Sequence, residues 1–268
     1  MTLPELGVVL RPQTPPEEIR AVVEHADRSG TPQLWLWEDC FLEGGLTTAA
    51  AALAWSERVV VGIGLLPVPL RNPALVAMEV ATLARLFPGR LAVALGHGVQ
   101  PWMVQVGAHV DSPMTLLREH TTAVRDLLAG QEVDVDGRYV HLDSVRLDWP
   151  PASPPTLLLG ARGDKTVSLA GELADGVLLD AVADVDAVRR ARASVDESRP
   201  AEREGRGLVV VYAEVDPRKH PDEASLDAGV REVADALGRA GADTVVLQST
   251  GDAPDPSSLI AAVARISA

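Results

Sequence analysis

The sequence predicts an α/β fold, a (β/α)8 or TIM barrel, because eight short apolar runs alternate with longer segments of helical period. Uniformly apolar runs are typical of parallel strands that are buried on both faces. A doubly wound open sheet is the alternative, since periodicity alone does not show that a sheet closes. The runs cover residues 6–10, 33–37, 59–66, 91–95, 156–160, 176–179, 208–212 and 244–247.

Helix boundary signals stand between these runs. Thr14 to Glu17 reads as an N-cap hydroxyl, a proline at the first helical position and an acid three residues after the cap. Gly30 follows where a left-handed helix end is expected. Ser112-Pro113 is a similar start, and Gly241 is expected to end a helix that begins near Asp222.

Residues 131–155 break the alternation. Asp136-Gly137 stands between alternating residues and predicts a type I′ turn. We therefore expect an inserted β-hairpin after the fourth strand, within a single barrel domain that covers residues 1–268.

Composition excludes several classes of protein. The net charge is −14 with no offsetting stripe of Lys or Arg, which argues against nucleic-acid binding. No uncharged stretch is long enough for a membrane span, and residues 1–13 lack the pattern of a signal peptide. Cys40 is the only cysteine, so no internal disulfide forms, and a cytoplasmic location is expected.

Barrel active sites lie at the carboxyl ends of the strands, so the residues after each apolar run are the candidates. They include no cluster of His and Cys with metal-ligand spacing, and no metal is predicted. Asp39, Asp180 and Glu214 are the carboxylates that an unrelated barrel hydrolase would bring together.

Two strand ends are rich in glycine. In "LLLGARGDK", Gly160 and Gly163 precede the start of a helix, where backbone amides bind anions, so this loop predicts a phosphate site. In "GHGVQPW", residues 96–98 bring bare backbone close to a flat ligand, with His97 as a donor and Trp102 as a wall.

Together these residues resemble the luciferase-like monooxygenase superfamily, whose barrels use FMN or the deazaflavin coenzyme F420. The most specific block is "VVVGIGLLPVPLRNPALVAMEVATLARLFPGRLAVALGHG". "AVVEHADRSGTPQLWLWED" resembles the family's first helix and second strand, and "PPTLLLGARGDKTVSLAGELADGVLLD" its late phosphate-side segment. The order of these segments is that of the family over nearly the whole chain.

The resemblance implies hydride transfer between reduced F420, or alternatively FMN, and a small organic substrate. It implies a non-prolyl cis peptide at Gly64–Leu65 behind the cofactor ring, and a homodimer. The expected catalytic residues are Asp39, Cys40 and His97, and the expected substrate contacts are Gln100 and Trp102. The expected cofactor contacts are Gly64, Leu65, Gly96, Gly98, Gly160, Ala161, Arg162, Gly163, Asp164 and Lys165.

Two departures from the family pattern affect the expected activity. Cys40 stands where many relatives have a histidine, and Val99 stands where sugar-phosphate dehydrogenase relatives have an acid. That dehydrogenase activity is therefore not expected, and the chain resembles the methylene-tetrahydromethanopterin reductase-like branch. The alternative hypothesis is a catalytically silent barrel of the same ancestry that binds a ligand.

Four further residues are interpreted as structural. Of Trp35 and Trp37, one is expected to face the barrel and the other the helices. His25 and His120 fall within amphipathic helices and are expected at the surface.

Overall fold

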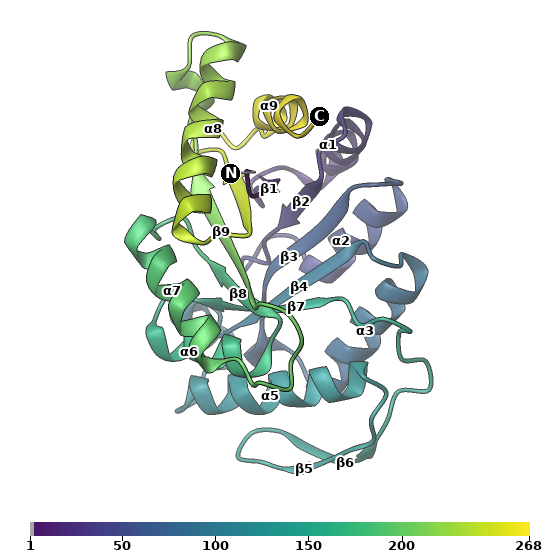
Figure 1. Ribbon diagram of the computed structural model, residues 1–268. Helices are drawn as coiled ribbons and strands as arrows, with labels where there is room; N and C mark the ends of the chain where they lie inside the picture. The colour runs from purple at the N-terminus through teal and green to yellow at the C-terminus, as the bar shows by residue number, and fades with distance from the viewer. Residues whose placement is uncertain (1–2) are drawn as a thin grey trace.

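A computed structural model describes residues 3–268 and shows a closed barrel of parallel strands (Figure 1). The strand order is β1-β10-β9-β8-β7-β4-β3-β2, and β1 pairs with β2 to close the ring. Closure confirms the predicted (β/α)8 barrel and rules out the open sheet. The strands are β1 (Glu5–Leu10), β2 (Gln33–Leu36), β3 (Val60–Pro67), β4 (Leu91–Gly96), β7 (Thr156–Ala161), β8 (Gly176–Leu179), β9 (Leu208–Glu214) and β10 (Thr244–Gln248).

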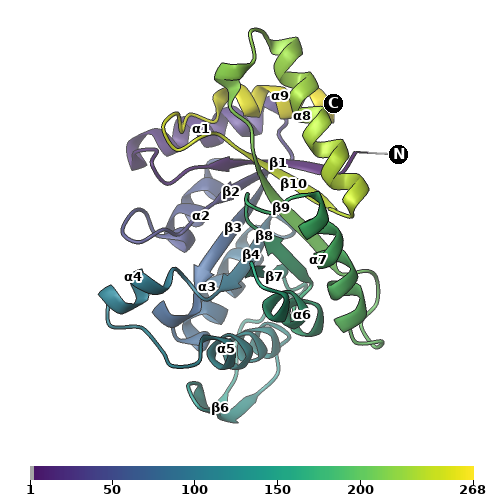
Figure 2. The same ribbon diagram turned by 90° about the vertical axis from the view of Figure 1, so that its left-hand side faces the viewer.

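Helices surround the barrel and return the chain to the amino-terminal side of the next strand (Figure 2). Among the described residues, no helix has the length and apolar character that crossing a membrane requires. The helices are α1 (Pro16–Ser29), α2 (Gly45–Ala54), η1 (Val68–Leu70), α3 (Pro73–Leu86), α4 (Gln100–Gln105), α5 (Pro113–Leu128), α6 (Asp164–Leu173), α7 (Val185–Ser198), η2 (Pro217–Lys219), α8 (Glu223–Ala240) and α9 (Ser257–Ser267).

The helix ends follow the sequence signals closely. Gly30 and Gly241 end α1 and α8 with φ of 82° and 112°, in the left-handed region that glycine adopts without a steric penalty. The Asp222 carboxylate accepts a hydrogen bond from the Ser225 amide and caps α8. Thr14 is not a cap, because α1 begins at Pro16 and its N-cap position is Pro15.

The predicted hairpin is present as antiparallel strands β5 (Val133–Asp136) and β6 (His141–Val145), but its turn is not type I′. Residues 137–140 form a longer loop with no positive φ, and Gly137 N–H donates to the Val140 carbonyl. The Glu119 carboxylate of α5 accepts hydrogen bonds from the three amides of residues 138–140, at 2.9 to 3.0 Å. This tertiary contact stabilises the four-residue loop in place of a two-residue type I′ turn.

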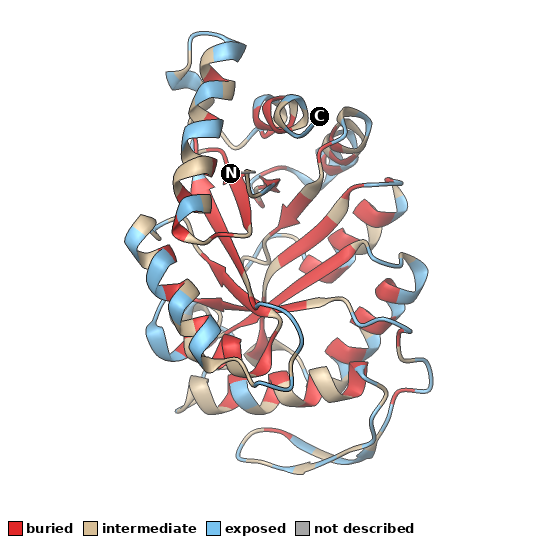
Figure 3. Cartoon of the chain, viewed as in Figure 1, coloured by how far each residue is buried: buried red, intermediate tan, exposed pale blue. Residues whose placement is uncertain are grey.

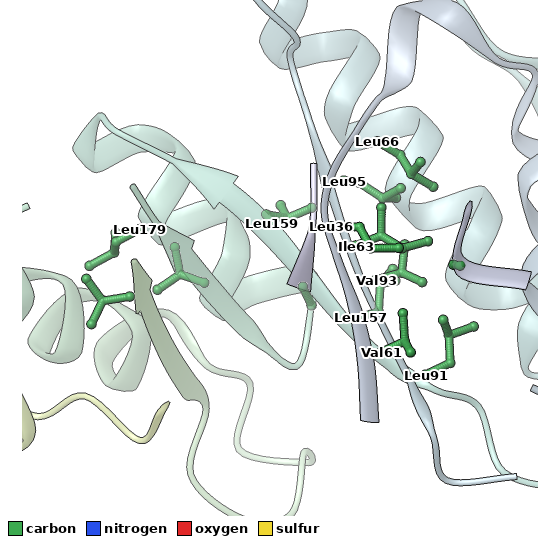
Figure 4. Packing of buried hydrophobic residues seen from close by; sticks show 14 of the residues in the cluster. Leu36, Val61, Ile63, Leu66, Leu91, Val93, Leu95, Leu157, Leu159 and Leu179 are labelled. Atoms are coloured by element: carbon green, nitrogen blue, oxygen red, sulfur yellow. The ribbon is translucent and has the colours of Figure 1, made fainter. Parts of the chain in front are cut away.

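Two apolar layers stabilise the barrel. The outer layer packs the strands against the inward faces of the helices (Figure 3), and Figure 4 shows part of it around Ile63, Val93 and Leu159. The inner layer fills the barrel, so the barrel is a packed core and no channel. Its buried members are Val9, Trp35, Ala92, Ala94, Leu158, Leu178, Val210, Tyr212 and Val246.

Trp35 of β2 and Trp37, directly after β2, both belong to the inner layer. Trp35 is buried inside the barrel, and Trp37 packs against the same cluster. The expectation that one of them faces the helices is wrong, because residues two apart on a strand point to the same face.

His120 is fully buried, so its expected surface position is also wrong. Its Nε2 lies 3.2 Å from the Arg71 carbonyl oxygen, which ties α5 to the segment after β3. Burial lowers the pKa of His120 from 6.5 to about 4, because the charged imidazolium is poorly solvated there.

This buried imidazole is expected to make the protein acid-sensitive. Below pH 6.5 the unfolded chain binds a proton at His120 while the folded protein does not, so stability falls as the pH drops toward about 4. Urea unfolding of the wild type and His120→Gln is expected to show a loss between pH 7 and pH 4.5 that is about 2 to 3 kcal/mol smaller in the variant. His25→Gln is the matched control, and an equal reduction there would contradict the prediction.

Candidate functional site at the carboxyl end of the barrel

Aromatic side chains form the floor of the barrel mouth, by which we mean the side where the strands end. Tyr212 extends from β9 across the barrel interior, and its hydroxyl donates to the Gly64 carbonyl of β3 at 3.1 Å. The Tyr212 ring lies 6.1 Å from the Trp35 ring in an edge contact and 5.7 Å from the Trp37 ring. Burial raises the pKa of Tyr212, so its hydroxyl stays protonated and acts as a hydrogen-bond donor.

The Gly64–Leu65 peptide bond is cis, as the family resemblance implies. At this point the pairing of β3 with β4 shifts register between Gly64 and Leu66. A Cβ on Gly96 would lie 2.5 Å from Leu65 Cδ2, and a Cβ on Gly160 would lie closer still. These two glycines therefore make room for the Leu65 side chain at the mouth, a reason for glycine that the sequence did not reveal.

Asp39 and Arg11 are the charged groups beside this floor. The Arg11 guanidinium lies 4.9 Å from the centre of the Trp37 ring, and its Nη1 donates to the Ser249 carbonyl at 2.7 Å. Burial raises the pKa of Asp39, and the positive charge of Arg11 opposes the shift. A half-buried carboxyl group of this kind holds its proton to a higher pH than an exposed aspartate.

Cys40 is half-buried, and burial together with the charges of Glu38 and Asp39 raises the pKa of its thiol. A protonated thiol is a poor nucleophile and a poor substitute for an imidazole. Cys40 is therefore a weaker candidate for the chemistry than its neighbour Asp39.

An ion pair holds the loop that carries Asp39. The Arg71 guanidinium, after β3, binds both oxygens of the Glu38 carboxylate, whose Oε2 also accepts the Gly45 amide at 2.7 Å. The two side chains are largely buried, with exposed fractions of 20% and 8%. This pair connects the ends of β2 and β3 to the start of α2. Glu38 and Arg71 appear among the strand-end residues, but the sequence does not indicate that they meet.

The structure places His97 beside α6 and not over the barrel axis. Gly96 faces the interior, so the next side chain points outward, and His97 Nε2 lies 3.3 Å from Thr166 Oγ1 in the first turn of α6. Burial lowers the pKa of His97. The Gln100 amide folds back to the His97 carbonyl at 3.1 Å, and Trp102 lies in α4, half-buried.

The loop predicted to bind phosphate leads directly into α6. Gly163 occupies the N-cap position without a side-chain hydrogen bond, and a Cβ added to it would meet no atom within 4 Å. The amides of Thr166 and Val167 donate to the Gly163 carbonyl, so the amides before Thr166 are the ones that could bind an anion. Arg162 is bound to Asp180 of the strand-end after β8, while Lys165 is exposed. This open backbone fits the phosphate group of a cofactor.

A cavity of about 340 Å³ lies beside the barrel, between η1, α5 and the hairpin. An F420- or FMN-dependent barrel is expected to have an open pocket over Gly64–Leu65, but neither residue lines this cavity. Its lining includes Arg71, His120 and Tyr139. Of the carboxylates that a hydrolase would bring together, Asp180 binds Arg162 and Glu214 is exposed. No group of three or more metal-ligating side chains occurs among residues 3–268.

The closed barrel, the register shift in β3 and the loop before α6 are the features that define the candidate site. A family model described as luciferase-like monooxygenase matches residues 1–226, and the chain belongs to this family.

Similar proteins include several coenzyme F420 enzymes. The 5,10-methylenetetrahydromethanopterin reductase of Methanolobus tindarius is 27% identical over 175 residues, which cover 65% of this chain and 53% of the relative. The F420-dependent glucose-6-phosphate dehydrogenase of Nakamurella multipartita is 28% identical over 150 residues, or 54% of this chain and 44% of the relative. The chain thus spans about half the length of these relatives.

Solved structures support the fold. The coenzyme F420-dependent tetrahydromethanopterin reductase from Methanopyrus kandleri superposes with a TM-score of 0.81 at 18% identity, covering 98% of both chains. The oxygenating constituent of 3,6-diketocamphane monooxygenase from Pseudomonas putida, in complex with FMN, superposes with a TM-score of 0.76 at 14% identity, covering 99% of this chain and 97% of that chain.

Proposed function

We propose that this protein is an oxidoreductase that uses coenzyme F420, with FMN as the alternative, to transfer a hydride to or from a small organic substrate. The observation that carries the proposal is the Gly64–Leu65 segment at the barrel mouth, where the pairing of β3 with β4 shifts register and the Tyr212 hydroxyl donates to the Gly64 carbonyl. The family membership and the F420-dependent relatives support it.

Different residues at the mouth would bind the cofactor and take part in the chemistry. The cofactor, when bound, would supply the hydride chemistry at position 5 of its ring. Leu65 would support one face of the ring, and the amides of residues 163–165 would hold its phosphate. Trp37 and Tyr212 fill the barrel interior under the mouth and exclude water from that side of the site. Asp39 would hold or give the proton that accompanies the hydride at the substrate oxygen or nitrogen.

We also propose a homodimer in the cytoplasm, as in the family resemblance. Large apolar side chains on one side of α3 support this assembly: Leu75, Met78 and Leu86 are 45%, 56% and 65% exposed. Contiguous exposed apolar surface on a helix is a feature of protein interfaces. Sedimentation equilibrium distinguishes the dimer from a monomer.

Cofactor titration tests the proposal. The purified protein is titrated with F420 and, separately, with FMN, following the absorbance and fluorescence of the cofactor. We expect saturable one-to-one binding of one of them, weakened at least tenfold in Gly163→Glu, which adds a negative charge in open space. Ala54→Glu, an exposed position at the end of α2, is the control of equal charge.

Two other outcomes of the titration have different meanings. Binding of neither cofactor would contradict the proposal and favour the ligand-binding barrel. Equal weakening by both glutamate variants would show that the net charge, and not the loop before α6, controls cofactor affinity.

A further inference from the structure

The cavity between η1, α5 and the hairpin, here named the hairpin cavity, takes no part in the proposed function. Figure 1 shows the hairpin beside α5, on the outside of the barrel. The cavity volume of about 340 Å³ lies within the range typical of small-molecule sites, about 300 to 1,000 Å³. Its walls are residues 68–73 after β3, Val110, Leu116 and His120 of α5, and residues 139–141 of the hairpin.

Hydrogen bonds fix the walls of the hairpin cavity. The Glu119 carboxylate of α5 accepts the amides of residues 138–140, and the Tyr139 hydroxyl accepts the Ser112 amide at 2.9 Å. On the side of η1, the His120 ring is bound to the Arg71 carbonyl. Because these contacts fix the hairpin and η1 relative to α5, the cavity is preformed, as small-molecule sites usually are.

The lining carries no unpaired charge. The Arg71 guanidinium binds the Glu38 carboxylate, and His141 Nδ1 lies 2.8 Å from the Asp136 carboxylate. Burial lowers the pKa of His120 to about 4, so its ring is neutral at neutral pH. No Asp or Glu is among the lining residues. A charged ligand would therefore lose its hydration without gaining an ionic partner, and the lining favours an uncharged molecule.

Two hydrogen-bond donors of the lining have no acceptor among residues 3–268. Asn72 Oδ1 accepts the Ala74 amide and caps α3, which leaves the Nδ2 hydrogens of Asn72 free to donate. The Tyr139 hydroxyl already accepts one hydrogen bond, and its own proton is free. A ligand oxygen that accepts these hydrogen bonds suits this part of the lining.

His120 adds an acceptor. Its ring is neutral and donates from Nε2 to the Arg71 carbonyl, so Nδ1 carries the lone pair. Nδ1 is buried and has no partner among the described residues. A buried polar atom without a partner costs free energy, which a donor from a ligand would recover.

We propose that the hairpin cavity binds a small uncharged carboxamide with an apolar body, at a site separate from the barrel mouth. The amide carbonyl accepts hydrogen bonds from Asn72 and Tyr139, and the amide N–H donates to His120 Nδ1. The apolar body packs against Val68 and Leu116, which are buried members of the outer apolar layer. An amide provides an acceptor and a donor without a net charge, whereas a carboxylate adds an unpaired charge and a hydrocarbon leaves all three polar groups without partners.

Methyl NMR of the full chain without cofactor tests the proposal. The Val and Leu methyl signals are followed during separate titrations with benzamide, benzoate and ethylbenzene. Benzamide is expected to bind saturably and one-to-one, with the largest shifts at Val68, Leu116 and Val140. Benzoate and ethylbenzene are expected to bind at least tenfold more weakly. Benzamide shifts that do not saturate, or that are largest at Leu65 of the mouth, would overturn the proposal.

Asn72→Asp tests the donor directly. The carboxylate keeps the cap of α3, and a negative charge is favourable at a helix N-terminus, so the fold is retained while both N–H donors are lost. Benzamide is expected to bind at least tenfold more weakly. Tyr139→Phe keeps the ring and is expected to cause a smaller loss. Gln131→Glu, at an exposed position after α5, makes the same change in charge outside the cavity and is expected to bind benzamide as the wild type does.

Two outcomes with these variants count against the proposal. An equal loss in Gln131→Glu would assign the effect to net charge, and unchanged affinity in both Asn72→Asp and Tyr139→Phe would exclude the assigned contacts.

Competition with the cofactor tests whether the two sites are separate. The benzamide titration is repeated with F420 and with FMN, and its affinity is expected to stay within about twofold. A loss of affinity that grows with cofactor concentration would place benzamide at the mouth and overturn the proposal. Because the first titration uses no cofactor, its result does not depend on the proposed function, and the failure of one proposal leaves the other to be judged by its own experiment.

Discussion

Replacing Asp39 by Asn is expected to lower kcat/KM of the cofactor-dependent reaction by about 10² to 10³-fold, the range that a positioned acid or base contributes. Asn has nearly the same shape but carries no transferable proton. The affinity for the cofactor is expected to stay within about twofold, measured by the same titration that establishes binding. Asp148→Asn, at an exposed position after β6, is the control.

The pH profile gives an independent signature of this role. Burial raises the pKa of Asp39, so its protonated form persists to a higher pH than in an exposed aspartate. Reduction of the substrate, with Asp39 giving the proton, requires the protonated acid, and its rate is expected to fall as the pH rises through this raised pKa. The Asn variant is expected to lose that limb of the profile. A profile that keeps the limb, or a kcat/KM within threefold of wild type, would contradict the assignment.

Gly64→Ala is expected to lower both the stability of the barrel and the affinity for the cofactor. A Cβ at this position would overlap the Tyr212 hydroxyl and lie 2.5 Å from Leu178 Cδ2. Overpacking a filled core costs about 1 to 3 kcal/mol. We expect a Tm lower by several degrees and a large loss of cofactor affinity, because Leu65 is displaced with its neighbour.

The double variant Gly64→Ala/Tyr212→Phe identifies the cause. Tyr212→Phe alone removes the hydrogen bond to the Gly64 carbonyl, at a cost of about 1 kcal/mol. Combined with Gly64→Ala it also removes the oxygen that the new methyl group meets, so the double variant is expected to be more stable than the sum of the two single changes predicts. Gly163→Ala, into open space, is the control. Strict additivity would contradict the close approach of Tyr212 to Gly64.

The local signals in the sequence predicted most of the fold. Each apolar run became a barrel strand, and Gly30 and Gly241 ended helices because only glycine reaches their backbone angles without a steric cost. The hairpin was expected from alternation, but its loop conformation was not. Glu119 shapes that loop, and it lies on a helix nearly twenty residues earlier in the chain.

In the candidate site, too, the sequence predicted where residues lie along the barrel but not which side chains meet. Sequence position was enough to predict that residues such as Asp39, Leu65 and Gly163 would share the carboxyl edge of the barrel, because parallel strands end together. Position alone did not reveal that the His97 ring lies beside Thr166 of α6. It also missed Tyr212, which lies in the middle of an apolar run and reads there as a core residue.

By itself, the sequence determined the barrel, the order of its elements, the edge that carries the site and the family. The tertiary structure decided which side chains meet there: Tyr212 with Gly64, Arg71 with Glu38, and Leu65 over Gly96 and Gly160. The physical reason is distance along the chain. Strand and helix signals depend on neighbours within a few residues, whereas these contacts join segments up to 148 residues apart and exist only once the barrel has closed.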